Sequence, residues 1–223
     1  LKKGDGSYAS EKTYSYKVSE VKGNAGDGIT YDDKEYTVKV KVSYDQASGT
    51  MKAELADKDQ KLAFANSYDT ETGIDLEGTK SLEGRTLKDG EFTFEVKDKA
   101  GKVVATGSNK SDGSISFNNK LNYKLSDLEK ADGSYESEKT YEYTVNEVIP
   151  EGATAENNYT VNGVTYDSKT VNVKVTVTYN KETGELKAEL AKDSEAIAFQ
   201  NSYETKTSIG LEGTKSLSGR TLK

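Results

Sequence analysis

Residues 74–82 read IDLEGTKSL, and every second residue of this stretch, counted from Ile74, is apolar or small except Lys80. Successive side chains of a β-strand point to opposite faces of a sheet, so the alternation predicts a strand with Lys80 on its apolar face. The same spacing in two later segments places Glu147 and Asn201 on apolar faces. Burying a lone charge costs on the order of several kcal/mol, so we expect the three polar groups to meet in the core and react with one another.

Period-two alternation continues through most of the segment between Lys80 and Asn201. The clearest strand is VNVKVTVTY at 171–179, and turn sequences such as DKAG at 98–101 and SDG at 111–113 separate shorter alternating runs. Eight or nine short strands of this kind predict an all-β fold built from immunoglobulin-like antiparallel β-sandwiches.

The chain also repeats itself. GSYASEKTYSYKVSE at 6–20 returns as GSYESEKTYEYTVNE at 133–147, and residues 52–88 return at 187–223. The offset rises from 127 to 135 residues between these blocks, so the second copy carries an eight-residue insertion near Asn157. Tandem repeats of about 130 residues are the size of a sandwich domain.

The repeat predicts three parts: the C-terminal part of a preceding repeat at 1–69, a complete repeat at 70–204, and the first strand of a following repeat at 205–223. The incomplete parts carry Glu20, Asn66 and Lys215 at the positions of Glu147, Asn201 and Lys80. We favour an excerpt of a longer array as the explanation. The alternative is that neighbouring copies complement one another by strand exchange, with Lys215 bonding Asn66 of the next copy.

Composition excludes several classes of function. The net charge is −7 and lysines alternate with acids, so no clustered basic face exists and no nucleic-acid partner is expected. The chain has no Cys and no His, which excludes thiolate zinc sites and Cys or His catalysis. No apolar run approaches the roughly 20 residues that span a bilayer. Acidic pairs such as Asp32-Asp33 lack a full calcium loop, so we expect solvated turns there, no metal and no cofactor.

Four blocks carry a family resemblance: GTKSLEGRTLKDGEFTFEV at 78–96, DGSISF at 112–117, YEYTVNEV at 141–148 and AFQNSY at 198–203. In this order they resemble the isopeptide-linkage domains of Gram-positive pilins and surface adhesins. In that family a first-strand lysine bonds a last-strand asparagine with help from a glutamate. The resemblance therefore implies a Lys80–Asn201 crosslink assisted by Glu147, secretion, attachment to the cell wall, and a place in a rod-like surface fibre.

The chemistry expected of these residues starts from a dry pocket. Desolvation favours the neutral form of both a buried lysine and a buried glutamate. We expect neutral Lys80 to attack the side-chain carbonyl carbon of Asn201, while protonated Glu147 donates a hydrogen bond to the developing oxyanion and then shuttles protons until ammonia leaves. Because this reaction turns over once on the protein itself, the chain is not expected to be an enzyme.

The leading function is that of a stalk or pilus-shaft repeat at the cell surface, with neighbouring repeats as partners and a host ligand reached through a distal domain. The alternative is a host-ligand-binding adhesin domain that uses its sandwich loops, for which the insertion near Asn157 is the candidate site. A carbohydrate-active enzyme needs two carboxylates facing each other across a cleft, and no spacing in the chain singles out such a pair.

Overall fold

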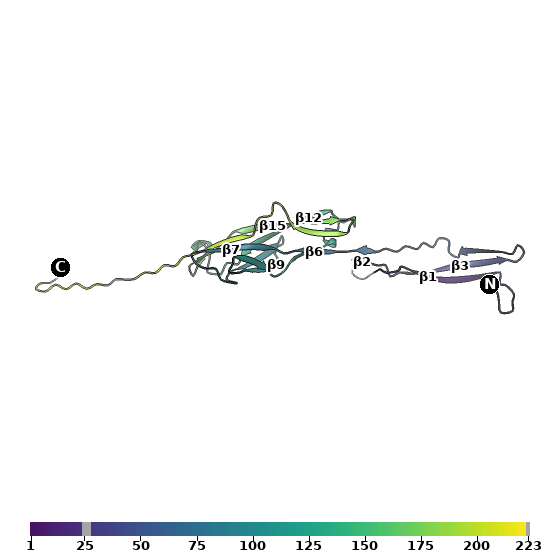
Figure 1. Cartoon of the computed structure of the whole chain (residues 1–223), viewed down its shortest axis with the longest axis horizontal. Helices are drawn as coiled ribbons and strands as arrows, with labels where there is room; N and C mark the ends of the chain where they lie inside the picture. Colours follow the sequence, from purple (N-terminus) through teal and green to yellow (C-terminus); the bar gives the residue numbers. More distant parts are fainter. Residues whose placement is uncertain (24–27, 222–223) are drawn as a thin grey trace. The chain divides into compact units, whose positions relative to one another are not determined.

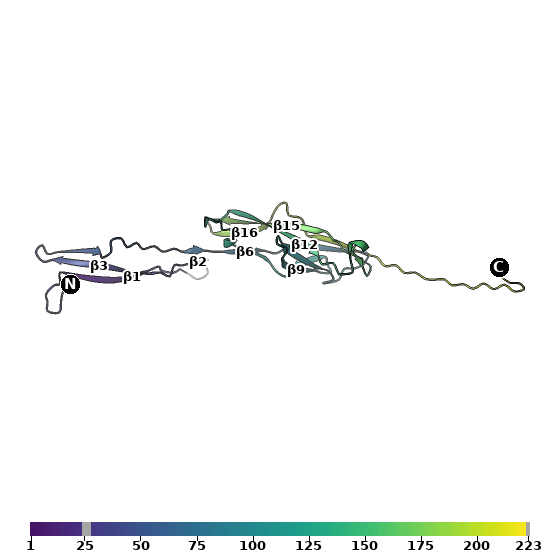
Figure 2. The same cartoon turned by 180° about the vertical axis from the view of Figure 1, so that it is seen from behind.

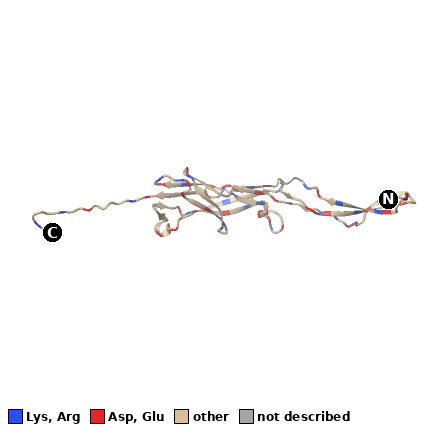
Figure 3. Ribbon diagram, turned by 90° about the horizontal axis from the view of Figure 1, so that it is seen from below, with Lys and Arg blue, Asp and Glu red and all other residues tan. Residues whose placement is uncertain are grey.

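The computed structural model describes residues 1–23 and 28–221. The chain divides into two compact units, Leu1–Thr70 and Glu71–Lys223. Nearly all of the regular structure is β, which confirms the predicted fold class. Acidic and basic side chains are interspersed along the ribbon of each unit (Figure 3), as the alternation in the sequence predicts. No described helix is both long and apolar enough to cross a membrane.

The first unit has one small sheet and one short strand pair. Strands β1 (Glu11–Ser19), β3 (Glu35–Asp45) and β4 (Thr50–Leu55) form an antiparallel sheet in the order β1-β3-β4. Strand β2 (Ile29–Thr30) pairs with β5 (Ser67–Tyr68). Every described residue of 1–70 is half-buried or exposed, because this unit contains no counterpart of residues 89–127 to cover the inner face of its sheet.

The second unit contains the large sheet. Its elements are β6 (Glu71–Ile74), β7 (Glu77–Glu83), β8 (Thr93–Asp98), β9 (Val103–Asn109), β10 (Ser114–Phe117), β11 (Leu121–Lys124), the 3-10 helix η1 (Leu125–Leu128), β12 (Glu138–Glu147), η2 (Ala155–Asn157), β13 (Thr160–Val161), β14 (Val164–Thr165), β15 (Thr170–Asn180), β16 (Glu185–Leu190) and β17 (Ala198–Tyr203). Ten strands form one sheet in the order β13-β14-β17-β7-β10-β9-β8-β12-β15-β16, and β11 pairs separately with β6.

One strand pairing differs from the antiparallel pattern that the sequence predicts. Strand β17 lies beside β7 and runs parallel to it (Figure 1), with Phe199 opposite Lys80 and Asn201 opposite Leu82. The close approach requires Gly78, because a Cβ atom there would lie 2.6 Å from Cγ2 of Ile197. Strand β7, which carries Lys80, and β17, the last strand of the 71–204 segment, are therefore direct neighbours.

The core lies inside this sheet. Its most buried side chains come from alternate positions of β8, β12 and β15, as period-two patterning predicts; they include Phe94, Val96, Val145, Val175 and Val177, each 0% exposed. Strand β15 lies between β12 and β16 (Figure 2) and confirms the strand predicted at 171–179. Full burial of one such side chain stabilises the fold by about 1.5–3 kcal/mol.

Beyond β17 the chain leaves the sheet. The described part of the predicted following strand, residues 205–221, forms no strand, and its side chains, Lys215 included, are exposed. The last two residues of that prediction lie outside the described residues. A strand needs a neighbouring strand to form its ladder of hydrogen bonds. Both edges of β17 are already occupied, one by β7 and the other by β14, so residues 205–221 cannot pair with it.

Candidate functional site

Three polar side chains from β7, β12 and β17 meet in the core of the second unit. Lys80 Nζ donates a hydrogen bond to Glu147 Oε2 at 2.7 Å, and Asn201 Nδ2 donates one to Glu147 Oε1 at 2.7 Å. The three residues are 3%, 5% and 1% exposed. Because β10, β9 and β8 separate β7 from β12 in the sheet, the contact requires the sheet to curl back on itself. The structure thus brings together the three residues that the spacing selected.

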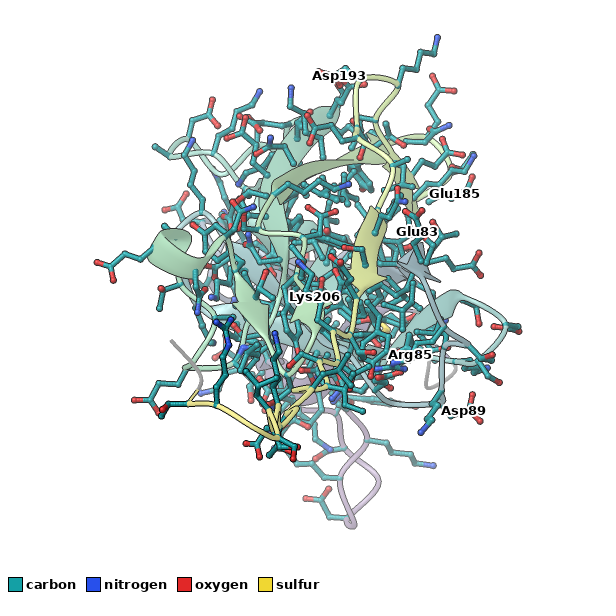
Figure 4. The ribbon with its side chains drawn as sticks, turned by 90° about the vertical axis from the view of Figure 1, so that its left-hand side faces the viewer. Glu83, Arg85, Asp89, Glu185, Asp193 and Lys206 are labelled. Atoms are coloured by element: carbon teal, nitrogen blue, oxygen red, sulfur yellow. The ribbon has the colours of Figure 1, made fainter. Side chains whose placement is uncertain are left out.

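Lys80 and Glu147 are buried, unlike most other charged side chains of this unit. Asp89, Glu185 and Asp193 are exposed and point away from the body of the ribbon (Figure 4). Lys80 and Glu147 form an ion pair in which both side chains are 0% exposed. This pair is therefore shielded from the solvent that weakens an ordinary surface salt bridge.

Aromatic rings form the apolar wall of the site. Lys80 Nζ lies 4.6 Å from the ring centroid of Phe92 and 5.9 Å from that of Phe94. Phe94 packs on Phe199 with ring centroids 5.1 Å apart, and Phe92 meets Tyr166 edge to face at 5.8 Å. These rings exclude water from the amine and the carboxyl group.

Exclusion of water changes the protonation of both groups. Desolvation lowers the pKa of Lys80 below its usual value, against the opposing effect of the Glu147 hydrogen bond. Desolvation likewise raises the pKa of Glu147, against the hydrogen bond and charge of Lys80. Both shifts favour moving one proton from the ammonium to the carboxylate. The site is thus suited to hold a neutral amine beside a carboxylic acid.

The side-chain amide of Asn201 is held in one orientation. Its Oδ1 accepts a hydrogen bond of 2.8 Å from the backbone N–H of Asp167, while its Nδ2 faces Glu147. A backbone N–H can only donate, so the atom facing Asp167 must be the amide oxygen. Glu147 therefore contacts the nitrogen of the amide and not its oxygen, which differs from the oxyanion contact expected for Glu147 from the sequence.

A second buried amide supports the aromatic wall. Asn109 is 1% exposed; its Oδ1 accepts the backbone N–H of Phe92 at 2.8 Å, and its Nδ2 donates to Lys88 O at 2.7 Å. These bonds fix the backbone at Phe92, whose ring lies against Lys80. No sequence pattern singles out Asn109, because an asparagine near a strand end is usually a turn former. A signal for Asp167 was present in the sequence, because YDDK at 31–34 and YDSK at 166–169 repeat with the same 135-residue offset as the asparagines.

The first unit repeats part of this arrangement. Asn66 Nδ2 donates to Glu20 Oε1 at 2.6 Å, and Asn66 Oδ1 accepts the backbone N–H of Asp32 at 2.9 Å. Among the described residues, Glu20 Oε2 has no hydrogen-bond partner, whereas the matching oxygen of Glu147 binds Lys80. The structure therefore places Glu20 and Asn66 together without a lysine.

The insertion near Asn157 folds into η2 and β13, and β13 pairs with β14. Asn157 satisfies the backbone of its own loop: its Oδ1 accepts the N–H of Thr154 at 2.8 Å and its Nδ2 donates to Gly152 O at 2.7 Å. Within residues 1–23 and 28–221, no cluster of acidic side chains is arranged to hold a metal ion.

A comparison with protein families finds one match that covers most of the chain. The family model described as "Spy0128-like isopeptide containing domain" matches residues 4–69 and 76–204, which together make up most of the chain. No curated protein matches the chain.

Solved structures give weaker likenesses. Two variants of the major pilin from Streptococcus pyogenes are 19% identical over 59% of this chain and 51% of the pilin, with TM-scores of 0.31 and 0.32. The T-13 major pilin from Streptococcus pyogenes is 17% identical over 88% of this chain and 69% of the pilin, with a TM-score of 0.20. The chain spans about half the length of the first two pilins. The family match, in contrast, covers most of the chain.

Proposed function

Because the chain belongs to the family of Spy0128-like isopeptide-containing domains, we propose that it is a structural repeat of a Gram-positive surface fibre, crosslinked by an amide between Lys80 and Asn201. The observation that carries the proposal is the position of Glu147, which hydrogen-bonds both Lys80 Nζ and Asn201 Nδ2 at 2.7 Å in the core. A carboxyl group between an amine and an amide nitrogen is placed to take a proton from one and give it to the other.

The reaction balances without a cofactor. The Lys80 ammonium passes a proton to Glu147, and the neutral amine attacks Cγ of Asn201 to give a tetrahedral intermediate. Glu147 then protonates Nδ2, the Cγ–Nδ2 bond breaks, and ammonia leaves. The new Nζ–Cγ amide returns its excess proton to Glu147. The products are one amide bond and one ammonia, formed once in each chain, so the protein is not an enzyme in the usual sense.

The fold supplies the positioning that this reaction needs. Reactants held in register gain effective molarities of up to about 10⁵–10⁸ M, so folding must precede the bond. A surface hollow of about 590 Å³ is lined by Asn201, Asp167, Tyr166 and Gln200, among others, and offers ammonia a route to solvent.

The mechanical role follows from the strand pairing. Strands β7 and β17 lie near the two ends of the 71–204 segment and are parallel neighbours. A covalent bond between them carries tension past β8 to β16, whose hydrogen bonds then bear little load. This property suits a stalk or pilus shaft on the cell surface, attached to the cell wall, with neighbouring repeats as partners and host contact made by a distal domain.

The proposal is tested by the intact mass of the denatured protein beside a Lys80→Ala variant. The wild type is expected to be lighter than its sequence by one ammonia, and the variant to have its full sequence mass. A wild-type mass equal to the sequence mass, from protein that folds, leaves an ordinary sandwich repeat and defeats the proposal.

A further inference from the structure

The carbonyl oxygen of Asn201 has its own hydrogen-bond donor, separate from Glu147. The backbone N–H of Asp167 lies 2.8 Å from Oδ1 of Asn201. When an amine attacks Cγ, negative charge develops on this oxygen, and a fixed N–H at this distance stabilises it. The atom that gains charge and the atom that must be protonated thus face different groups, Asp167 and Glu147.

The carboxylate of Asp167 holds that N–H in place. Its Oδ2 accepts the backbone N–H of Gln200 at 3.1 Å and the Lys169 ammonium at 3.1 Å, and its Oδ1 accepts the backbone N–H of Lys169 at 3.2 Å. Gln200 directly precedes Asn201 in β17. One side chain therefore ties the 166–169 loop to the strand that carries the acceptor. Burial raises the pKa of Asp167, but these hydrogen bonds outweigh it, and the net pKa lies below the usual value, so the carboxylate stays ionised.

The first unit builds the same arrangement from its own residues. Asp32 donates its backbone N–H to Asn66 Oδ1 at 2.9 Å and accepts the backbone N–H of Ala65 on Oδ2 at 2.9 Å. Lys34 pairs with the same Asp32 oxygen at 2.9 Å, as Lys169 does with Asp167. The hydrogen bond from Ala65, followed by those from Lys34, lowers the pKa of Asp32 to about 2.

One hydrogen-bond pattern thus recurs at four matching positions: Asp32, Lys34, Ala65 and Asn66 in the first unit, and Asp167, Lys169, Gln200 and Asn201 in the second. The first unit keeps this pattern although none of its described residues is fully buried. Dense core packing is therefore not what sets the geometry.

We propose that Asp167 is a positioning residue for crosslink formation, whose carboxylate anchors its own backbone N–H as the oxyanion donor for Asn201. The inference rests on the proposed Lys80–Asn201 reaction. In that reaction the Asp167 N–H stabilises the oxyanion, and Glu147 transfers protons to and from nitrogen.

The test measures the rate of bond formation during folding. Full-length protein is made by a short pulse of cell-free synthesis and quenched in acidic denaturant at timed intervals, and intact mass gives the fraction that has lost ammonia. Asp167→Ala is expected to react on the order of 10²-fold more slowly, because the donor loses its anchor. Asp167→Asn is expected to recover most of the rate, since its single amide oxygen can take the place of Asp167 Oδ2 and accept the Gln200 N–H. Ser168→Ala, an exposed neighbour in the same loop, is the matched control and is expected to react at the wild-type rate.

A backbone substitution tests the donor itself. Replacing the amide of residue 167 by an ester, with the matching α-hydroxy acid in the same synthesis, removes the N–H and keeps the side chain. A loss of about 10²–10³-fold is expected, with the pH dependence of the rate unchanged because Glu147 is untouched. If Asp167→Ala does not fold, the ester variant still tests whether the N–H of residue 167 stabilises the oxyanion.

Wild-type rates in both Asp167→Ala and the ester overturn the inference and leave the Lys80–Asn201 bond standing. A wild-type protein that never loses ammonia refutes the proposed function instead, so the two failures are distinguishable.

Discussion

Replacing Lys80 by Met is expected to lower the melting temperature of the second unit by about 18 °C. Met keeps an unbranched apolar stem of similar size but has no amine, so the crosslink cannot form and little cavity is left. The proposed bond would close a loop from residue 80 to residue 201, about 120 residues, which corresponds to about 5 kcal/mol in the chain-entropy model. Unfolding entropy of about 2.1 cal/mol/K per residue over roughly 130 residues is about 0.27 kcal/mol/K, and the ratio of the two values gives the shift.

The loss of the Lys80 hydrogen bond adds to this effect. Glu147 Oε2 is left in the core without its partner, which costs about a further 1–3 kcal/mol, so about 18 °C is a lower bound. The assay is thermal unfolding followed by circular dichroism. Lys187→Met is the control, because it makes the same substitution at an exposed position of β16. The ion pair that Lys187 forms with Glu189 lies in solvent and contributes little to stability.

The reasoning is refuted if Lys80→Met melts within about 3 °C of the wild type, since that shift corresponds to less than 1 kcal/mol. It is equally refuted if Lys187→Met produces the same loss as Lys80→Met.

Three further outcomes are expected. Glu147→Gln keeps the shape of the site but cannot shuttle protons, so the folded variant should retain its full sequence mass; an ammonia loss at the wild-type rate would remove Glu147 from the mechanism. Asn109→Ala leaves the buried Phe92 N–H without its partner and removes the donor to Lys88 O, and urea unfolding should show a loss of about 1–3 kcal/mol; an unchanged midpoint would contradict this role. In Lys80→Met the folded pKa of Glu147 lies above its unfolded value near 4.5, so its stabilising contribution is complete below that pH and is lost as the pH rises through the folded pKa. The urea midpoint should therefore fall as the pH rises above about 4.5, and a double variant that also carries Glu147→Gln should show no such fall.

The sequence predicts much of this site because β-strand geometry is regular. Alternation is enough to place Lys80, Glu147 and Asn201 on inner faces, since a strand reverses its side chain at every residue. The repeat then supplies Glu20 and Asn66, which the structure also brings within hydrogen-bond distance of each other.

What the sequence does not predict depends on contacts between strands far apart in the chain. The parallel pairing of β7 with β17 follows from the order of the whole sheet, which no local pattern encodes. The orientation of the Asn201 amide depends on a backbone N–H in a loop 34 residues earlier, so it is not visible in the periodicity of β17. The role of Asp167 is not predicted either, because an acidic residue in a polar loop is typical of a solvated turn.

Peptide mapping of the denatured wild-type protein tests the central claim most directly. Proteolysis followed by tandem mass spectrometry is expected to yield one branched peptide in which the segment around Lys80 is joined to the segment around Asn201, lighter by one ammonia than its two parts. Two separate linear peptides with unmodified Lys80 and Asn201, from protein shown to be folded, would contradict the account.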